Sequence, residues 1–558
     1  MSDRWCVAFA AAIALGAHLG GGPSPLVGLV LGAIGLVAGR PWLLCLAGAI
    51  AAAGLAARAD AAFAAPLPTG PVRAWVTLLT DPAPLPGGAA RRFDVRLDGR
   101  RLEASARGDA AAAVMERAAG ERVLLSGSVQ SPPPNAGWLR ARHVVGRLAV
   151  DDVERWAPGS PVSRLANGVR RTLAAGAEAL PPDRRALFTG VVLGDDRGQP
   201  ADLADDFRAA GLTHLLAVSG QNVAFLLAVA GPLLRRLSWR GRLPATLAVL
   251  GFFALLTRFE PSVLRATAMA AIATVAAAIG RPQDGVRLLA IAVGALLLID
   301  PFLVRSVGFG LSVGASAGIV LLAPRIERSL PGPAPLRAAL AVTVAAQAGV
   351  APILVPVFGS IPVATLPANL LAVPAAGPLM MWGLTGGMTA GLVGGGPLRS
   401  ALHAPSELLL WWLAGVARHA AELPLGELSA LHVVVIGAGV ALRVAGRHWR
   451  LPALPAVGLA AAAVVVLLPL VTQPTPPGGR SAPALGVELW RDGRRTAAVL
   501  DGRARAGPAL EALRRSGARC VGTVVVRSEA ASTLETVAAL ARRCPSLEVR
   551  FEGRGPPR

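Results

Sequence analysis

The stretch GLTHLLAVSGQNVAFLLAV, residues 211–229, indicates the fold class of this chain. It is an apolar run that carries four polar side chains near its start, namely His214, Ser219, Gln221 and Asn222. The run begins a dense apolar block that extends to about residue 472. Because a helix needs about 20 apolar residues to cross a bilayer, this block predicts a polytopic α-helical membrane protein.

Further apolar segments raise the expected number of spans to about 10 to 14 by the same length rule. Three short candidates precede the block, near residues 5–21, 25–39 and 41–57. Those within the block lie near residues 212–234, 243–258, 261–280, 286–300, 306–324, 337–356, 361–395, 405–421, 429–446 and 452–472. A composition of 53% hydrophobic and 16% charged residues, with a mean hydropathy of +0.54, also excludes a disordered chain.

Two polar regions divide the chain into four parts. We expect N-terminal membrane spans over residues 1–58 and a small outer β domain over residues 66–158. A membrane domain is expected over residues 180–472, and a short α/β domain over residues 484–558. The two polar regions are therefore predicted to be separate domains attached to one helical block.

The placement of arginine predicts how the chain is oriented in the membrane. The chain has no lysine, so its net charge of +21 comes from arginine. Arginines concentrate in two short loops: Arg235, Arg236, Arg240 and Arg242 in one, and Arg443, Arg447 and Arg450 in the other. Because such loops stay in the cytoplasm, we expect a cytoplasmic N-terminus and both polar regions outside. The same rule explains the positive charge, so charge alone identifies no nucleic-acid partner.

Alternating apolar residues over 66–158 predict five short strands, with a hairpin turn at Asp98-Gly99. Five strands in so short a segment favour a small barrel, and the OB-fold is the leading candidate. OB barrels often bind single strands by stacking bases on aromatic side chains along a basic groove. The aromatic residues available are Trp75, Phe93, Trp138 and Trp156. A purely structural barrel fits the same residues.

The polar tail has a βαβ-like pattern that ends abruptly. Strands are expected at residues 487–490, 496–500, 521–526 and 547–551, and helices at residues 508–516 and 532–543. A core of this size is marginal, so the tail is expected to be a fragment of a larger domain or to lean on the membrane block. Cys520 and Cys544 are expected to pair only if the tail faces an oxidising compartment.

The stretch at 211–229 resembles the signature of the ComEC family of DNA-uptake channels, in which Gly-x-x-His-Leu-Leu-Ala, an apolar residue and Ser-Gly precede a polar pair and Val. Four more segments resemble family motifs in the same order: LFTGVVLGDD (187–196), PSVLRATAM (261–269), DPFLVRSVGFGLSVGASAGIVLL (300–322) and PVATLPANLLAVPAAGP (362–378). SPPPNAGWLR, residues 131–140, weakly resembles the outer OB domain of the family. Asn222 departs from the pattern, because many relatives have His there, and this puts a proton-dependent role at that position in doubt.

The resemblance implies a bacterial inner-membrane channel for uptake of single-stranded transforming DNA during natural competence. It implies that the DNA path is lined by His214, Ser219, Gln221, Asn222, Arg265 and Asn369. In the outer domain it implies that Trp138 and Arg140 contact DNA. Its implied partners are single-stranded DNA, the bacterial membrane, a competence DNA receptor, and a cytoplasmic translocation ATPase or single-strand-binding proteins.

Arg265 lies near the start of a predicted span, where an arginine is costly unless it meets an anion, an acid or water. A passing phosphate is one such partner. An ion pair with Glu260 or Asp300 is the structural alternative.

The other polar residues of the block also have two interpretations. Asn369 lies between Pro367 and Pro374, which are expected to interrupt the helix as at transport sites. His214 and Asn222 are eight residues apart, so on one helix they would project to similar sides. The interrupted helix around Asn369 and the pair His214 and Asn222 both fit a water-lined path. His214 and Asn222 fit hydrogen bonds between packed helices equally well.

ComEC relatives commonly end in a metallo-β-lactamase-like nuclease domain, and AVLDGRARAGPALEALRRSGARCVGTVVV, residues 498–526, resembles its framework. Its metal ligands follow a strand as a His-x-His-x-Asp-His run or its His-x-Asp-x-Asp-His variant. Here Arg527 and Ser532 stand in place of histidines and Ala531 in place of an aspartate, so Glu529 alone keeps ligand chemistry. We expect a truncated, non-catalytic tail, no metal and no cofactor.

Two other functions stay open at this stage. One is a membrane-anchored nuclease, which the missing ligand run argues against. The other is a small-solute or lipid transporter, or a degenerate protein without transport activity, on the same helical scaffold, which hydrophobic periodicity does not exclude.

Overall fold

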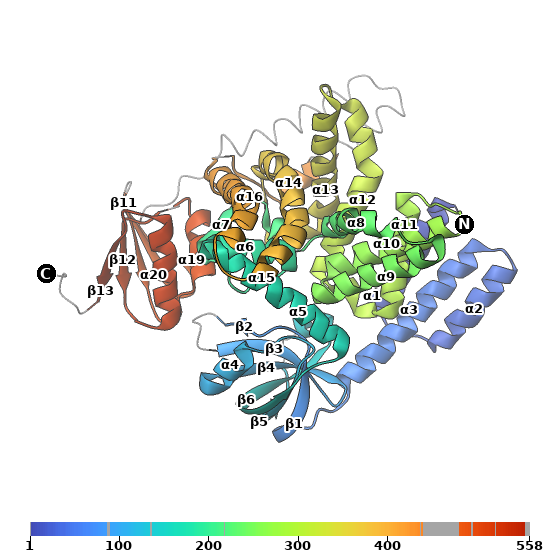
Figure 1. The fold of residues 1–558 in the computed structure, drawn as a ribbon, viewed down its shortest axis with the longest axis horizontal. Coiled ribbons are helices and arrows are strands. Elements are labelled where there is room, and N and C mark those ends of the chain that lie inside the picture. Colours follow the sequence, from blue (N-terminus) through green and yellow to red (C-terminus); the bar gives the residue numbers. More distant parts are fainter. Residues whose placement is uncertain are drawn as a thin grey trace.

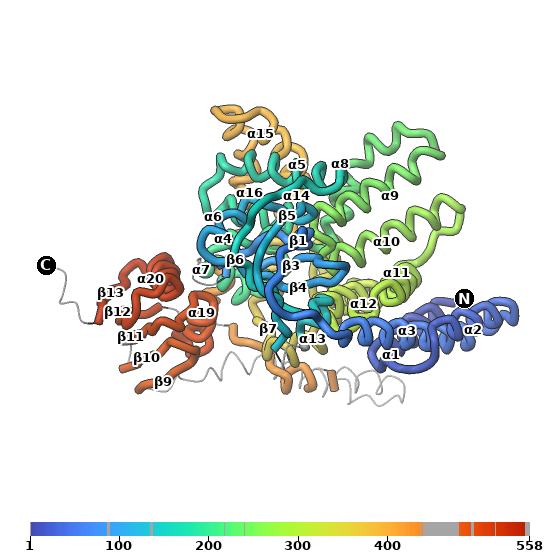
Figure 2. Tube along the Cα trace, turned by 90° about the horizontal axis from the view of Figure 1, so that it is seen from below, coloured from blue at the N-terminus to red at the C-terminus, as the bar shows by residue number. Residues whose placement is uncertain are grey.

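The structure is a computed structural model that describes residues 2–85, 90–133, 137–216, 218–423, 425–435, 437–438, 479–492, 495–518 and 520–552. The N-terminal helices lie at one end of the molecule and the C-terminal α/β domain at the other (Figures 1 and 2). The larger sheet lies between them, below the helical block in the view of Figure 1.

Three helices begin the chain, as the sequence predicts: α1 (Asp3–Leu19), α2 (Pro25–Val37) and α3 (Pro41–Ala64). Proline stands at the first position of α2 and α3, where its missing N–H costs no hydrogen bond. The C-terminal half of α3 reaches the β domain, since Arg140 forms an ion pair of 3.7 Å with Asp60.

The β domain is a six-stranded sheet with one short helix, α4 (Gly108–Met115), and a 3-10 turn, η1 (Gly137–Arg142). Its strands are β1 (Gly70–Leu78), β2 (Ala83–Pro84), β3 (Ala90–Leu97), β4 (Arg100–Arg107), β5 (Arg122–Gln130) and β6 (Val144–Ala157). The five predicted strands are confirmed, while the sequence analysis missed α4 and β2.

The strand pairings of this sheet form a closed cycle, running β1–β5–β6–β4–β3 and back from β3 to β1. All of these pairs are antiparallel except β4 with β6, which is parallel. Asp98 and Gly99 have φ of 48° and 79° at the β3–β4 turn, which confirms the predicted hairpin. Alternate residues of β5 are buried, and they pack with Phe93 and Leu102 into one core.

The helical block follows directly after the sheet. Its first elements are α5 (Pro161–Gly176), η2 (Ala177–Ala179), α6 (Pro182–Leu193), α7 (Ala201–Ala209) and η3 (Thr213–Leu215). The long helices are α8 (Gly220–Leu234), α9 (Trp239–Leu256), α10 (Pro261–Ala278), α11 (Gly285–Ile299), α12 (Val307–Ser329), α13 (Ala334–Phe358), α14 (Thr365–Trp382) and α16 (Pro397–Glu422). Shorter elements join them: η4 (Pro301–Arg305), β7 (Ile361–Pro362), η5 (Gly383–Gly387), α15 (Met388–Val393) and β8 (Glu427–Leu428).

Six helical stretches of the described chain are long and apolar enough to cross a membrane: Pro41–Ala64, Thr213–Leu234, Pro261–Ala278, Val307–Ser329, Ala334–Phe358 and Thr365–Val393. This is fewer than the predicted 10 to 14. At 1.5 Å per residue, the apolar helices α2 and α11 are about 20 and 23 Å long, short of a bilayer core of about 30 Å. The predicted span at 452–472, half of that at 429–446 and the arginine loop between them lie outside the described residues.

Two helix interruptions differ from the expectation. Helix α14 continues through Pro374, so Asn369 does not lie in a proline-broken segment. The irregular turn comes later, as the π-helical η5. The signature stretch is instead divided into η3 and α8, so His214 and Asn222 do not share one helix and the predicted common face is wrong.

Helices α12 and α13 are among the closely packed pairs of the block. A Cβ placed on Gly349 of α13 would come within 2.1 Å of the backbone oxygen of Gly314 on α12. The two backbones therefore approach each other through small residues, as membrane helices often do.

The C-terminal domain is a five-stranded sheet with two helices. Its elements are β9 (Gly479–Ala484), β10 (Val487–Asp492), β11 (Arg495–Leu500), α19 (Ala506–Arg515), β12 (Thr523–Val526), α20 (Ala531–Arg543) and β13 (Glu548–Phe551). The predicted order of strands and helices is confirmed, and only β9 was missed. Cys520 and Cys544 form a disulfide.

This domain docks on α7, with α19 and α20 beside it (Figure 1). Arg543 pairs with Asp205 and with Asp206, each at 2.7 Å, and Asp205 is almost completely buried. Arg514 of α19 pairs with Glu427 in β8. As the sequence analysis expected, the small domain leans on the helical block.

We expect Arg543→Ala to destabilise this docking by about 3–5 kcal/mol, because it leaves the buried carboxylate of Asp205 with weaker compensation. Limited proteolysis of the purified full chain with thermolysin measures the effect as faster release of the C-terminal domain. Arg550→Ala is the matched control, since Arg550 pairs with Glu548 at the surface and such pairs contribute at most about 1 kcal/mol. Equal cleavage rates for the two variants would contradict the docking role.

Candidate functional site

Arg265 is a buried cation of the helical block, where Arg170 is also buried. It lies on α10 and is only 8% exposed. Its Nε donates a hydrogen bond of 2.7 Å to the Ser312 hydroxyl, and its Nη1 lies 3.2 Å from the Met269 sulfur. No acid of the described chain forms an ion pair with it, so the alternative of a pair with Glu260 or Asp300 is wrong. Asp300 instead lies 2.9 Å from His143 of the β domain.

The guanidinium of Arg265 packs against the first residue of α8. A Cβ on Gly220 would lie 2.4 Å from Nη2 of Arg265, so a larger residue there would displace the guanidinium from this position. The N-terminus of a helix carries a partial positive charge and unpaired N–H groups. The Ser219 side chain does not cap these groups, because its hydroxyl donates to Asn222 instead, at 3.3 Å. Two positive groups thus face each other with no acid between them, which is an arrangement that attracts an anion.

The remaining signature residues divide into packing and exposed positions. Asn222 is buried, and its Nδ2 donates a hydrogen bond of 3.2 Å to the backbone oxygen of Val191 on α6. That contact fits the structural alternative of a hydrogen bond between helices. His214 and Gln221 are exposed, on η3 and on the first turn of α8.

Asn369 lies on α14, one turn after Thr365. Both side chains are buried, and neither the Asn369 Oδ1 nor the Thr365 Oγ1 has a hydrogen-bond partner among the described residues. Thr365 lies against Gly211 at the start of the signature stretch, since a Cβ on that glycine would fall 1.8 Å from Oγ1. Two unpaired polar atoms are costly in an apolar interior, so water or a ligand group is expected there. The described contacts do not join this pair to Arg265.

The outer-domain residues Trp138 and Arg140 lie on η1. Trp138 is 50% exposed, and the guanidinium of Arg142 lies over its ring at 5.7 Å. Arg140 is occupied by α3, because it pairs with Asp60 and lies over the Phe63 ring at 5.3 Å. Trp138 is therefore available to a stacking base, whereas Arg140 contributes to docking of the domain.

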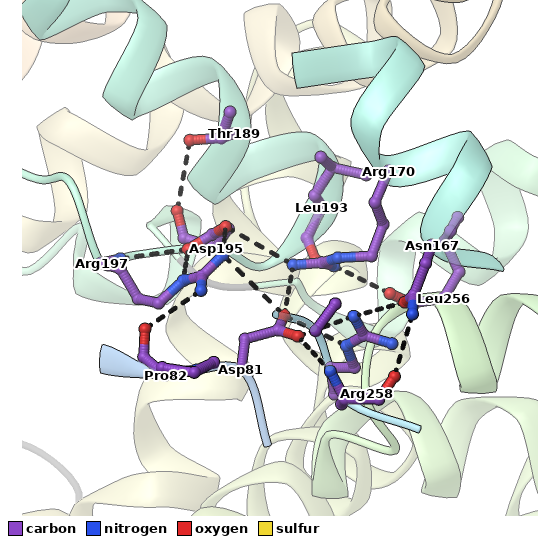
Figure 3. A network of polar contacts seen from close by, with 12 residues as sticks. Asp81, Pro82, Asn167, Arg170, Thr189, Leu193, Asp195, Arg197, Leu256 and Arg258 are labelled. Carbon is purple, nitrogen blue, oxygen red and sulfur yellow. Dashed lines mark hydrogen bonds and ion pairs between the residues drawn. The ribbon is translucent and has the colours of Figure 1, made fainter. Parts of the chain in front are cut away.

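A cleft of about 960 Å³ separates the β domain from the ends of the membrane helices. At its base is a network that we call the arginine cluster (Figure 3). It consists of Asp81, which follows β1, and of four residues of the helical block: Arg170, Asp195, Arg197 and Arg258. Arg170 comes from α5, Asp195 and Arg197 from the segment after α6, and Arg258 from the turn after α9.

The contacts within the arginine cluster are short and mostly buried. Arg258 holds both carboxylate oxygens of Asp81, at 3.1 and 2.7 Å. Arg170 lies 3.2 Å from Asp81 and 3.5 Å from Asp195, and its Nη1 donates to the backbone oxygens of Leu193 and Leu256. Burial alone raises the pKa of both carboxyl groups, but the neighbouring arginines lower the pKa of each below its usual value. Both aspartates are therefore ionised at neutral pH.

The arginine cluster was not predicted from the sequence. One signal was present, since Asp195 lies in the LFTGVVLGDD segment that resembles a family motif. Asp81, Arg170 and Arg258 lie in three other segments that share no motif, and only the fold brings them together.

The six long apolar helices of the described chain fit a multi-pass helical membrane protein, to which two polar domains are attached. Residues 191–450 match the model of the family described as "Competence protein", so this part of the chain is similar to that family. The site at Arg265 and Gly220 lies inside the matched region.

Two curated proteins are similar to part of the chain. "Uncharacterized protein YcaI" of Escherichia coli (strain K12) is 30% identical over 207 residues, which are 34% of this chain and 27% of that protein. "ComE operon protein 3" of Bacillus subtilis (strain 168) is 28% identical over 198 residues, 35% of this chain and 25% of that protein. The matches thus span about a quarter of each relative. No solved structure matches the chain.

Proposed function

We propose that the protein conducts single-stranded DNA across the bacterial inner membrane during natural competence. The observation that carries this proposal is Arg265, a buried guanidinium with no acid partner in the described chain, packed on the N-terminus of α8. A phosphodiester supplies the missing negative charge, and it can accept hydrogen bonds from both groups. The competence family match over the same residues supports the proposal.

The β domain fits a receiving module for the incoming strand. Its closed cycle of strand pairings, with one parallel pair, is consistent with a small OB-like barrel. Trp138 offers an exposed ring next to Arg142, and Arg142 lines the cleft. A base stacked on this ring would enter beside the arginines that line the cleft.

We propose a cytoplasmic N-terminus and an outer location for both polar domains. The β domain contacts the turns around Arg258 and Asp300, and the C-terminal domain contacts Glu427, which pairs with the segment after α13. All of these turns lie on the outer side in the topology expected from the arginine loops. A disulfide in the C-terminal domain is also typical of an oxidising compartment.

Reporter fusions test this topology. Fusions near Gly108 and Gly507 are expected to report the outside, and fusions near Gly241 and Gly446 the cytoplasm. Alkaline phosphatase and a fluorescent protein give opposite readouts at each position. A cytoplasmic signal from the Gly507 fusion would overturn the placement of the C-terminal domain.

We propose that the C-terminal domain is not a nuclease. At the expected ligand run, Arg527 pairs with Glu552 at 3.1 Å and with Glu488 at 3.7 Å, and a guanidinium repels a divalent cation. The described part of the chain contains no group of three His, Cys, Asp or Glu residues placed to hold a metal. We expect the purified full chain to bind no stoichiometric zinc or manganese and to leave duplex DNA intact with either metal. Metal-dependent cleavage that Glu529→Ala removes would establish the alternative function of a membrane-anchored nuclease.

Transformation measured in a deletion strain tests the proposed function. Complementation with this sequence is expected to restore transformation, with labelled DNA reaching the cytoplasm. DNA that stays in the periplasm despite normal protein level would contradict a channel and leave a small-solute transporter on the same helices as the better account. Capture of the protein with the competence DNA receptor, the translocation ATPase or a single-strand-binding protein tests the partners that the family resemblance implies.

A further inference from the structure

Asp81 is the one member of the arginine cluster that the β domain supplies. Its carboxylate is only 9% exposed and contacts Arg258 at 2.7 Å and Arg170 at 3.2 Å, while Arg197 lies 3.9 Å away. The other four members belong to the helical block. If Asp81 moves away, three guanidinium groups share the single carboxylate of Asp195. The four remaining residues of the cluster would then carry a net charge of +2, with Asp196 as a further acid near Arg197, and such an excess of poorly hydrated positive charge is unfavourable without an anion.

The geometry of the cluster suits a phosphate as well as a carboxylate. Arg258 holds Asp81 through two parallel N–H···O bonds, which is the arrangement arginine also makes with phosphate oxygens. Arg258 and Phe259 both have left-handed backbones, with φ of 60° and 57°, a costly conformation for residues other than glycine. The turn after α9 is therefore held in a shape that aims Arg258 at the carboxylate.

The cleft next to the cluster is large enough for a nucleic-acid strand, at about 960 Å³, and other arginines line it. Arg96 is exposed on β3 and has no acid partner in the described part of the chain. Within the residues that the structure describes, Arg100 donates only to the backbone oxygens of Ala65 and Pro66. These two cations lie on the β-domain wall of the cleft, and the cluster lies at its base.

We propose that the arginine cluster is a phosphodiester-binding site that the protein's own Asp81 occupies at rest. An incoming phosphate takes over Arg258 and Arg170, and the segment carrying Asp81 is released from the helical block. The segment of the β domain that carries Asp81 is therefore bound to the helical block when no DNA is present, and it dissociates from the block when DNA enters the cleft. This inference rests on the proposed function, because it assigns a second phosphate site on the same DNA path.

Binding of a dT oligonucleotide to the purified full chain in detergent tests the proposal. Asp81→Asn keeps the size of the side chain and removes its charge, so we expect several-fold tighter binding. The dependence on salt should also steepen by about 0.7 in log–log slope for each added phosphate contact. Glu154→Gln is the matched control, because this substitution removes the same charge from the β domain. Glu154 pairs with Arg73, and neither residue lines the cleft. Equal affinities for the two variants would overturn the proposal.

Hydrogen exchange of the wild-type protein gives a second measurement that needs no variant. The backbone of residues 79–85 is expected to exchange faster when the oligonucleotide is saturating, because Asp81 leaves the cluster. Unchanged or slower exchange at saturation would overturn the displacement of Asp81 while leaving DNA conduction intact. Failure of every variant to bind the oligonucleotide would overturn both this site and the proposed function.

Discussion

Replacing Arg265 with alanine is expected to abolish arrival of labelled DNA in the cytoplasm and to lower transformation by at least about 100-fold. The substitution removes a buried cation that has no acid partner in the described chain, so it takes away attraction for phosphate without breaking an ion pair. Arg265→Lys should recover part of the activity, since an ammonium keeps the charge but lacks the planar fork. The measurement is transformation frequency together with DNA location, in the same cells.

Three further variants separate a DNA path from a packing role. Gly220→Ala retains Arg265 but places a methyl group 2.4 Å from its Nη2. The variant should therefore impair uptake although the charge of the site is unchanged. His214→Ala and Asn369→Ala should have smaller effects, because uncharged groups contribute hydrogen bonds rather than attraction. Arg287→Ala is the control arginine, since Arg287 pairs with Asp3 and should not affect uptake. Loss of protein in parallel with loss of uptake would favour packing, and normal uptake with Arg265→Ala would remove this residue from the path.

Gly349→Ala is expected to destabilise the helical block by about 1–3 kcal/mol, as overpacking typically does. The added methyl group would meet the Gly314 backbone oxygen at 2.1 Å, and backbone cannot rotate away as a side chain can. Gly251→Ala on α9 is the matched control, because nothing lies within 4 Å of the added atom. Alanine is the better helix former by about 0.5–1 kcal/mol, so the control should be neutral or stabilising. Melting temperatures in detergent should therefore shift in opposite directions, and equal shifts would contradict the close packing of α12 on α13.

Local patterns in the sequence predicted the elements of both polar domains. The strands of the β domain and the strand and helix order of the C-terminal domain follow from alternation and turn residues, which depend on near neighbours in the chain. The hairpin at Asp98-Gly99 is an example, since both residues favour the left-handed backbone that the turn requires. Short elements such as β2 and α4 carry too few residues to show a period.

Prediction failed where tertiary contacts decide the outcome. The signature stretch has continuous hydropathy, but its helix is interrupted. The 3-10 turn η3 ends at Leu215 and α8 begins at Gly220, where Arg265 packs against the backbone. Pro374 was expected to break α14, yet the helix continues because neighbouring helices can stabilise a proline-containing segment. The arginine cluster could not be predicted from the sequence either, because it also depends on tertiary contacts: Asp81 and Arg258 are 177 residues apart.

The docking of the C-terminal domain on α7 also bears on how the chain folds during synthesis. Asp205 and Arg543 are separated by 338 residues, and a ribosome adding about 5–20 residues per second needs roughly 17 to 68 s to make that segment. Throughout this interval the acidic face of α7 is without its arginine partner from α20. The contact that holds the C-terminal domain on α7 must therefore be among the last to form, and a chain released early would retain an exposed acidic helix for quality-control proteases to recognise.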